Sequence, residues 1–188
     1  MAPIMSRIPA VIEAEMNSAQ RRVYDAMLSG PRNSPPVGPL AVAMHCPELA
    51  EAMSAMGLVL RFNSSFEPRL REFAILTCGR HWDCQFEWAS HEGEARKAGL
   101  SEVSIATLKA GGSAFEQADE QAIFDYATEL LARKFVSEAV YQRVVGVFGV
   151  AGAVELTGLI GYYAMVALML NAAEIEVPEG MPRLPARG

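Results

Sequence analysis

The sequence has too few cysteines for a disulfide-stabilised protein. Its 188 residues include only Cys46, Cys78 and Cys84, and three thiols cannot all pair within one chain. Small secreted proteins that depend on disulfides have many more cysteines for their length. The start of the chain also lacks the basic segment and unbroken apolar run of a secretion signal. We therefore expect a reduced, cytoplasmic protein.

Clustered positive charge is also missing. The chain has 16 Lys and Arg against 22 Asp and Glu, so its formal net charge is −6. Proteins that bind nucleic acids usually carry a basic patch or stripe that contacts phosphates. No such block is present, and we expect no nucleic-acid partner.

Period-two alternation of apolar and polar residues, which a half-buried strand requires, is absent. Apolar residues instead recur at helical spacing between capping and terminating residues, which predicts one all-α domain over residues 1–188. Within it we expect an N-terminal helix and Pro-rich link (1–39), a helical core (40–176) and an extended Pro-rich tail (177–188). The expected helices cover residues 17–30, 47–63, 68–82, 83–99, 101–111, 118–135, 138–149 and 152–173.

One segment is apolar enough to resemble a membrane span. Residues 156–173 contain no charge over 18 positions, which is the usual lower limit for a spanning helix. Glu155 and Glu174 bracket the segment, and Asn171 interrupts it. We therefore expect a helix buried inside the protein or an oligomer, and no membrane partner.

The stretch 71–101 concentrates the residues that can do chemistry. On a helix that Asp83 caps and Gly99 ends, Cys84, Glu87 and His91 share one face. The residues expected to face solvent are Gln85, Ser90, Glu92, Arg96 and Lys97. A carboxylate one turn from an imidazole is suited to general acid–base catalysis. The same pair can also be a satisfied polar contact in a core, with Cys84 a small buried residue.

Redox and metal chemistry have weaker support. Cys78 and Cys84 are six residues apart, about 9 Å along a continuous helix, whereas a disulfide needs α-carbons within about 7 Å. A bridge would require a bend at Gly79. Paired Cys-x-x-Cys or His-x-x-x-His spacing is missing, so we expect no metal site and no cofactor.

Residues 80–101, "RHWDCQFEWASHEGEARKAGLS", closely resemble the signature of the carboxymuconolactone decarboxylase family of the alkylhydroperoxidase D-like superfamily. The resemblance extends in order to "RRVYDAMLSGPR", "RFNSSFEPRLREFAIL", "LTGLIGYYAMVALMLNA" and "VPEGMPRLP". It implies an all-α alkylhydroperoxidase D-like fold of about seven or eight helices. It also implies assembly into a homotrimer or homohexamer.

The superfamily has two activities, and the sequence matches them unequally. The peroxidase branch uses Cys-x-x-Cys-x-x-x-His with a glutamate twelve residues earlier, which corresponds here to Cys84, His91 and Glu72. The second cysteine of that motif is replaced by Glu87. The decarboxylase-like branch needs no cysteine, and this chain resembles it at Arg80, His81, Trp82, Phe86, Glu87, Trp88 and His91.

The resemblance therefore implies a lyase that acts on a small carboxylated lactone or a related intermediate of aromatic catabolism. In this hypothesis His91 supplies or shuttles a proton, and Glu72 and Glu87 orient or recharge it. The remaining expected site residues are His81, which polarises the lactone carbonyl, and Arg80, Arg71, Trp82 and Trp88, which bind substrate. The alternative for both arginines, which their residue type favours, is ordinary surface or intersubunit ion pairing.

Two alternatives remain open at this stage. One is a thiol peroxidase centred on Cys84, which requires a depressed thiol pKa. The other is an oligomeric binding protein without catalysis. Self-association is expected in either case, because the final helix is apolar on nearly every side. The features assigned to its outer face are the pair Tyr162–Tyr163 and the glycines Gly149, Gly152, Gly158 and Gly161.

Overall fold

The computed structural model describes residues 6–186, and all regular structure within them is helical. A 3₁₀ turn (Glu13–Glu15) precedes α1 (Ser18–Ser29) and the short α2 (Pro39–Ala43). The helices that follow are α3 (Pro47–Phe62), α4 (Pro68–His81), α5 (Gln85–Lys97), α6 (Glu102–Ala110), α7 (Ala118–Arg133) and α8 (Glu138–Ala172). The all-α prediction is confirmed. The short helix α2, between the Pro-rich link and α3, was not expected.

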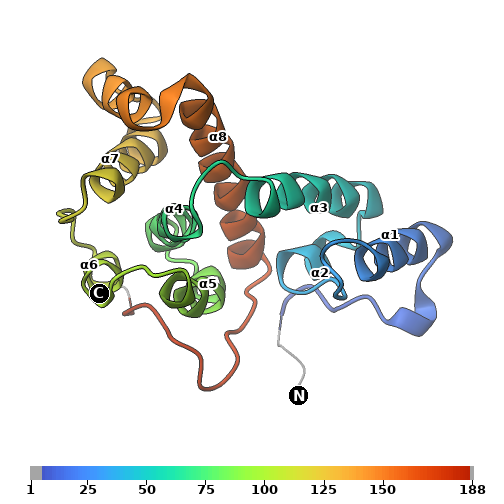
Figure 1. Ribbon diagram of the computed structural model, residues 1–188. Helices are drawn as coiled ribbons and strands as arrows, with labels where there is room; N and C mark the ends of the chain where they lie inside the picture. Colours follow the sequence, from blue (N-terminus) through green and yellow to red (C-terminus); the bar gives the residue numbers. More distant parts are fainter. Residues whose placement is uncertain (1–5, 187–188) are drawn as a thin grey trace.

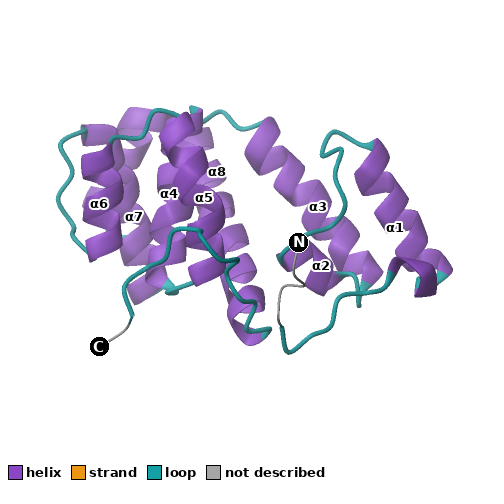
Figure 2. Cartoon of the chain, turned by 90° about the horizontal axis from the view of Figure 1, so that it is seen from below, coloured by secondary structure: helices purple, strands orange, loops and turns teal. Residues whose placement is uncertain are grey.

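The helices form two groups that meet along α8. Helices α4, α5, α6 and α7 pack beside α8 on one side, while α1, α2 and α3 lie on the other (Figures 1 and 2). Both α2 and α3 also contact α8. Beyond α8 the described part of the tail has no helix and returns to α5, where the Leu184 N–H donates to Gln85 Oε1 at 2.9 Å. The groove between the two groups is where the polar site residues gather.

Local sequence signals explain where the helices begin. Asn17 caps α1 in a reciprocal capping box with Gln20, and Ser101 caps α6. Pro47 and Pro68 occupy the first turns of α3 and α4, where a missing N–H costs nothing. The N-terminal end of α5 differs from the prediction. Asp83 is left-handed (φ 44°) and pairs with Arg80, so that Cys84 is the N-cap residue.

Helix α8 is two helical segments joined at a kink. Gly149 has φ 72° and ψ 174°, a combination that is essentially restricted to glycine. This position fits the prediction of separate helices over 138–149 and 152–173, but gives Gly149 a backbone role instead of the close helix approach expected of it. Among residues 6–186, α8 alone has the length and apolar composition of a membrane span, and one third of its most apolar window is buried within this chain.

The kink predicts opposite effects for two nearby glycines. Gly149→Ala should lower the free energy of unfolding by about 1–3 kcal/mol, because alanine is strained in this conformation. Gly146 is helical, and a side chain added there meets nothing within 4 Å. Gly146→Ala should therefore raise the free energy of unfolding by up to about 1 kcal/mol. Urea denaturation of both variants measures the difference, and equal effects would contradict the kink.

Candidate functional site

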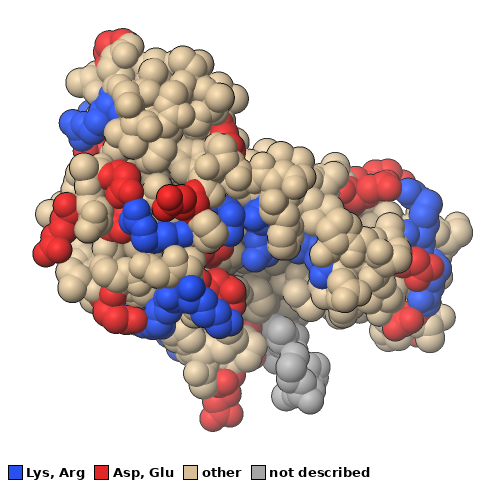
Figure 3. Space-filling view, viewed as in Figure 1, with Lys and Arg blue, Asp and Glu red and all other residues tan. Residues whose placement is uncertain are grey.

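A cavity of about 140 Å³ lies between α3, α5 and α8 and is closed on one side by the link that leads into α2. Figure 3 shows the corresponding hollow on the surface, with basic side chains beside it. The residues that line it are Arg32, Val37, Pro39, Leu40, Arg61, Phe86, Glu87, Ser90, His91, Tyr162, Tyr163, Val166 and Leu170. Polar groups from distant parts of the sequence therefore meet on one mainly apolar wall.

Glu72 and His91 form a buried hydrogen-bonded pair between α4 and α5. His91 Nδ1 lies 2.7 Å from Glu72 Oε2. The Tyr163 ring stands edge-on to the imidazole, with ring centroids 5.3 Å apart. A carboxylate accepts a hydrogen bond from Nδ1–H, which leaves Nε2 as the nitrogen that can exchange a proton with a ligand. The carboxylate thus fixes both the tautomer and the orientation of His91.

Glu87 has a different environment from Glu72. Its side chain lines the cavity, the residue is only 2% exposed, and neither carboxylate oxygen has a hydrogen-bond partner among the described residues. A Cβ at Gly79 would lie 3.3 Å from Glu87 Oε1, so α4 covers this carboxyl group closely. Burial raises the pKa of Glu87 well above its usual value of 4.5. Burial therefore favours the neutral carboxylic acid form of Glu87, which can donate a proton.

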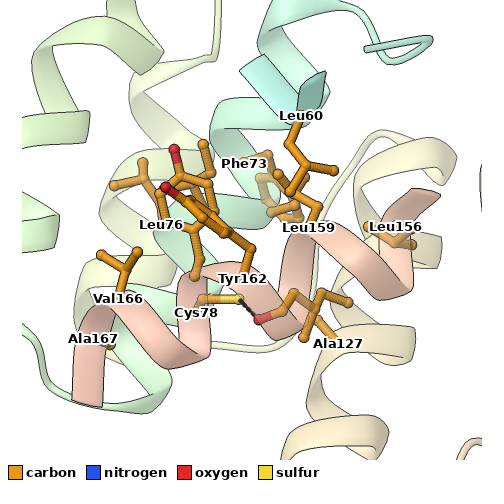
Figure 4. Close-up of a cluster of buried hydrophobic side chains, with 14 of the residues drawn as sticks. Leu60, Phe73, Leu76, Cys78, Ala127, Leu156, Leu159, Tyr162, Val166 and Ala167 are labelled. Atoms are coloured by element: carbon orange, nitrogen blue, oxygen red, sulfur yellow. Dashed lines mark hydrogen bonds between the residues drawn. The ribbon is translucent and has the colours of Figure 1, made fainter. Parts of the chain in front are cut away.

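Cys78 and Cys84 lie in the core beside this acid and are both free thiols. Burial is the largest of the causes that raise the pKa of Cys84 to about 12. Cys78 donates a weak hydrogen bond to the Ile160 carbonyl at 3.9 Å, within the apolar cluster around α8 (Figure 4). Burial is also the largest cause that raises the pKa of Cys78. Both thiols therefore stay protonated, which is the opposite of the activation that a peroxidase requires.

Several expected site residues lie away from this cavity. Arg80 and His81 line a separate cavity of about 240 Å³ near α6 and α7, and Arg80 pairs with Asp83. The carbonyl oxygen of Trp82 accepts a hydrogen bond from Asn171 Nδ2 at 2.9 Å, and its ring does not line the His91 cavity. Arg71 lies outside the cavity lining, with Nε 3.9 Å from Glu72 Oε1.

Trp88 and Glu92 belong to a buried polar network. Trp88 is fully buried, and its Nε1–H donates to Glu92. The prediction that Glu92 faces solvent was wrong, because Trp88, Arg96 and Lys109 compensate the burial of its carboxylate. Burial alone would raise the pKa of Glu92, but hydrogen bonds from these three residues lower it. Charged partners thus keep this buried carboxylate ionised.

The cavity also contains residues that the sequence did not reveal. Arg32 comes from the Pro-rich link, to which no site residue was assigned, and Arg61 comes from the last turn of α3. Tyr162 and Tyr163 were expected on an outer face, but both are buried within the chain. Tyr162 Oη donates to the Met53 carbonyl at 3.1 Å. Their helical spacing could not distinguish an inward-facing from an outward-facing pair.

Comparisons with known proteins agree with this architecture. Residues 47–129 match the family model described as "Carboxymuconolactone decarboxylase family". This part of the chain is therefore similar to that family. The matched region contains α3, α4 and α5, and with them Glu72, Glu87 and His91.

A solved structure from Ralstonia eutropha JMP134 shares the fold. It is described as an "alkylhydroperoxidase AhpD core: uncharacterized peroxidase-related protein" and has 16% sequence identity, a TM-score of 0.75 and 95% coverage of each chain. At this identity the similarity shows the fold alone. No curated protein matches the chain significantly.

The raised pKa of Glu87 predicts a pH dependence of stability. The unfolded chain releases the Glu87 proton near pH 4.5, whereas the folded chain keeps it to higher pH. The contribution of Glu87 to the free energy of unfolding is therefore fully present below pH 4.5 and is lost as pH rises. Relative to Glu87→Gln, the wild-type free energy of unfolding should fall above pH 4.5, with a slope of up to about 1.4 kcal/mol per pH unit. Denaturant titrations from pH 4 to pH 8 measure this.

Glu94 is the matched control on the same helix. A hydrogen bond from Lys97 lowers the pKa of this exposed glutamate. Relative to Glu94→Gln, the wild-type free energy of unfolding should therefore change in the opposite direction and be lost as pH falls. A flat difference for Glu87→Gln would mean that Glu87 ionises normally in the folded protein.

Proposed function

We propose that the protein is a small-molecule lyase that uses acid–base catalysis. Its reaction would be decarboxylation or proton transfer on a carboxylated lactone or a related intermediate of aromatic catabolism. The observation that carries the proposal is the presence of a neutral Glu87 and a Glu72-bound His91 on the wall of one cavity. Two carboxyl groups with different environments can take separate acid and base roles. The match of residues 47–129 to the carboxymuconolactone decarboxylase family also supports an enzymatic role.

The proposed chemistry follows from these two environments. Loss of CO₂ breaks a carbon–carbon bond and leaves its electron pair conjugated with the lactone carbonyl as a dienolate. Glu87 donates its proton to the carbon end of this anion. After product release His91, oriented by Glu72, accepts a proton from water at Nε2 and passes it to the Glu87 carboxylate, so that each turnover consumes one proton from the solvent. Each group finishes in its starting protonation state.

The thiol peroxidase alternative has less support. Peroxide reduction needs a thiolate and a second thiol that closes a disulfide. Cys84 is buried with a pKa of about 12, and the position of the second cysteine in the motif is occupied by Glu87. The Ralstonia structure is described as peroxidase-related, but that description applies to that protein. The lyase proposal gives Glu87 a catalytic role, whereas the thiol mechanism gives it none.

Self-association is a further part of the proposal. Exposed apolar side chains occur on both α3 and α8, and Val154 is 69% exposed. These side chains are Leu49, Met56, Val59 and Phe62 on α3, and Val147, Val150, Val154 and Leu168 on α8. An apolar surface distributed over two adjacent helices is typical of a subunit interface. A homotrimer or homohexamer would cover it.

The catalytic proposal predicts the effects of three substitutions. With a panel of carboxylated lactones, Glu87→Gln and His91→Ala should each lower turnover about 10²- to 10⁴-fold, which is the usual contribution of a positioned acid or base. Glu94→Gln should retain full activity, because this residue lies on the exposed side of the same helix. Substrate absorbance and released CO₂ measure the reaction.

Hydroperoxide consumption by the same variants tests the alternative. The lyase proposal predicts that Cys84→Ala does not change lactone turnover. Thiol titration of the folded protein should detect Cys46 rapidly, since it is exposed, and Cys78 and Cys84 only after unfolding. Rapid peroxide turnover that is lost in Cys84→Ala, together with full lactone turnover in Glu87→Gln, would refute the lyase.

The assembly proposal predicts the mass of the protein in solution. Light scattering at micromolar concentration should give three or six times the 20.4 kDa of one chain. Val154→Glu should shift the mass towards that of the monomer, because it places a charge on the exposed apolar surface. A monodisperse wild-type monomer would contradict assembly and would favour a contact between α8 and lipid instead.

A further inference from the structure

We propose that Arg32 and Arg61 form an anion-binding subsite in this cavity for the carboxylate of a ligand that consists of one ring. This inference rests on the proposed function, because it assigns the substrate class of the same site. It also replaces Arg80 and Arg71, which lie outside the cavity lining, as the groups that bind the carboxylate. The two arginines come from the link before α2 and from the end of α3.

The first argument is the missing countercharge. Most arginines in residues 6–186 pair with a carboxylate, including Arg69 with Asp119 and Glu120. Neither Arg32 nor Arg61 has an ion-pair partner in this part of the chain, although both line a cavity. Arg32 Nε is also buried without a hydrogen-bond partner. Unpaired buried donors are rare in folded proteins, and a bound anion would satisfy them.

The second argument is the mutual effect of the two charges. Burial lowers the pKa of Arg32, and the neighbouring positive charge of Arg61 lowers it further. Two neighbouring cations that have no ion-pair partner among the described residues destabilise the folded chain. A ligand carboxylate removes that repulsion, and guanidinium groups match its two oxygens geometrically.

The third argument is that two glycines hold Arg32 in place. Gly38 has φ 55°, and a Cβ there would lie 2.8 Å from the Phe86 ring, so the link passes directly against α5. A Cβ at Gly57 would lie 2.7 Å from Tyr162 Oη and 3.3 Å from Arg32 Nη2. Only glycine therefore lets α3 approach the guanidinium and the phenol this closely.

The fourth argument is the size and polarity of the cavity. A cavity of about 150 Å³ in another protein accommodates benzene, and this one measures about 140 Å³. Val37, Leu40, Phe86, Val166 and Leu170 give it an apolar wall that suits a ring. The arginines supply the only positive charges among its lining residues, all of which are described. A ring with one carboxylate combines these requirements.

Benzoate tests the subsite without requiring turnover. Isothermal titration should detect benzoate binding to the full chain, with much weaker binding of the uncharged analogue benzamide and of inorganic phosphate. Arg32→Gln and Arg61→Gln should each weaken benzoate binding about 10- to 100-fold, which is the usual worth of a charge-assisted hydrogen bond. Arg133→Gln, a change in an exposed ion pair on α7, should leave the affinity unchanged.

Folding and chemistry are separated by two further measurements. The free energy of unfolding of Arg32→Gln and Arg61→Gln should equal or exceed that of the wild type, because each substitution removes a like-charge contact. Glu87→Gln should still bind benzoate, so failure of the lyase proposal would leave this binding intact. Equal affinity for benzoate and benzamide, wild-type affinity in both arginine variants, or phosphate binding as tight as benzoate binding would overturn the subsite.

Discussion

The site depends on the close packing of α4 against α5. Gly79 on α4 has no side chain, so the backbone covers the Glu87 carboxyl group and keeps it from solvent. The same contact between the helices brings Glu72 to His91 at 2.7 Å. One helix interface therefore creates both a neutral acid and an oriented imidazole.

Three buried glutamates in this small region differ in their hydrogen-bond partners. Glu72 is hydrogen-bonded to His91, and Glu92 accepts hydrogen bonds from three donors. The Glu87 carboxyl group has no hydrogen-bond partner among the described residues. Each is nearly fully buried, so exposure alone cannot explain their different roles. For two of them the partners decide the pKa: hydrogen bonds lower the pKa of Glu92, whereas burial without such partners raises the pKa of Glu87. The unpartnered group is the one placed on the cavity wall.

Sequence patterns predicted the helices and the inward face of α5 because both depend on local spacing. Helical periodicity placed Glu87 and His91 on one face, and the family resemblance added Glu72. Arg32 could not be predicted in this way, because it lines the cavity from the link, and the contact of the link with α5 has no periodic signature. The predictions that Glu92 and Tyr162 face outwards were wrong for a related reason, since the burial of both side chains depends on contacts with other helices.

The Pro-rich link has a more specific role than its composition suggests. Residues 31–39 contain four prolines, which restrict the backbone before the protein folds. A flexible loop would let Arg32 move into solvent and away from Arg61, because repulsion and hydration both favour that escape. The restricted link and the contact of Gly38 with Phe86 oppose it. The chain therefore holds an unpaired guanidinium beside a neutral acid, and this arrangement makes the cavity complementary to an anion before any ligand arrives.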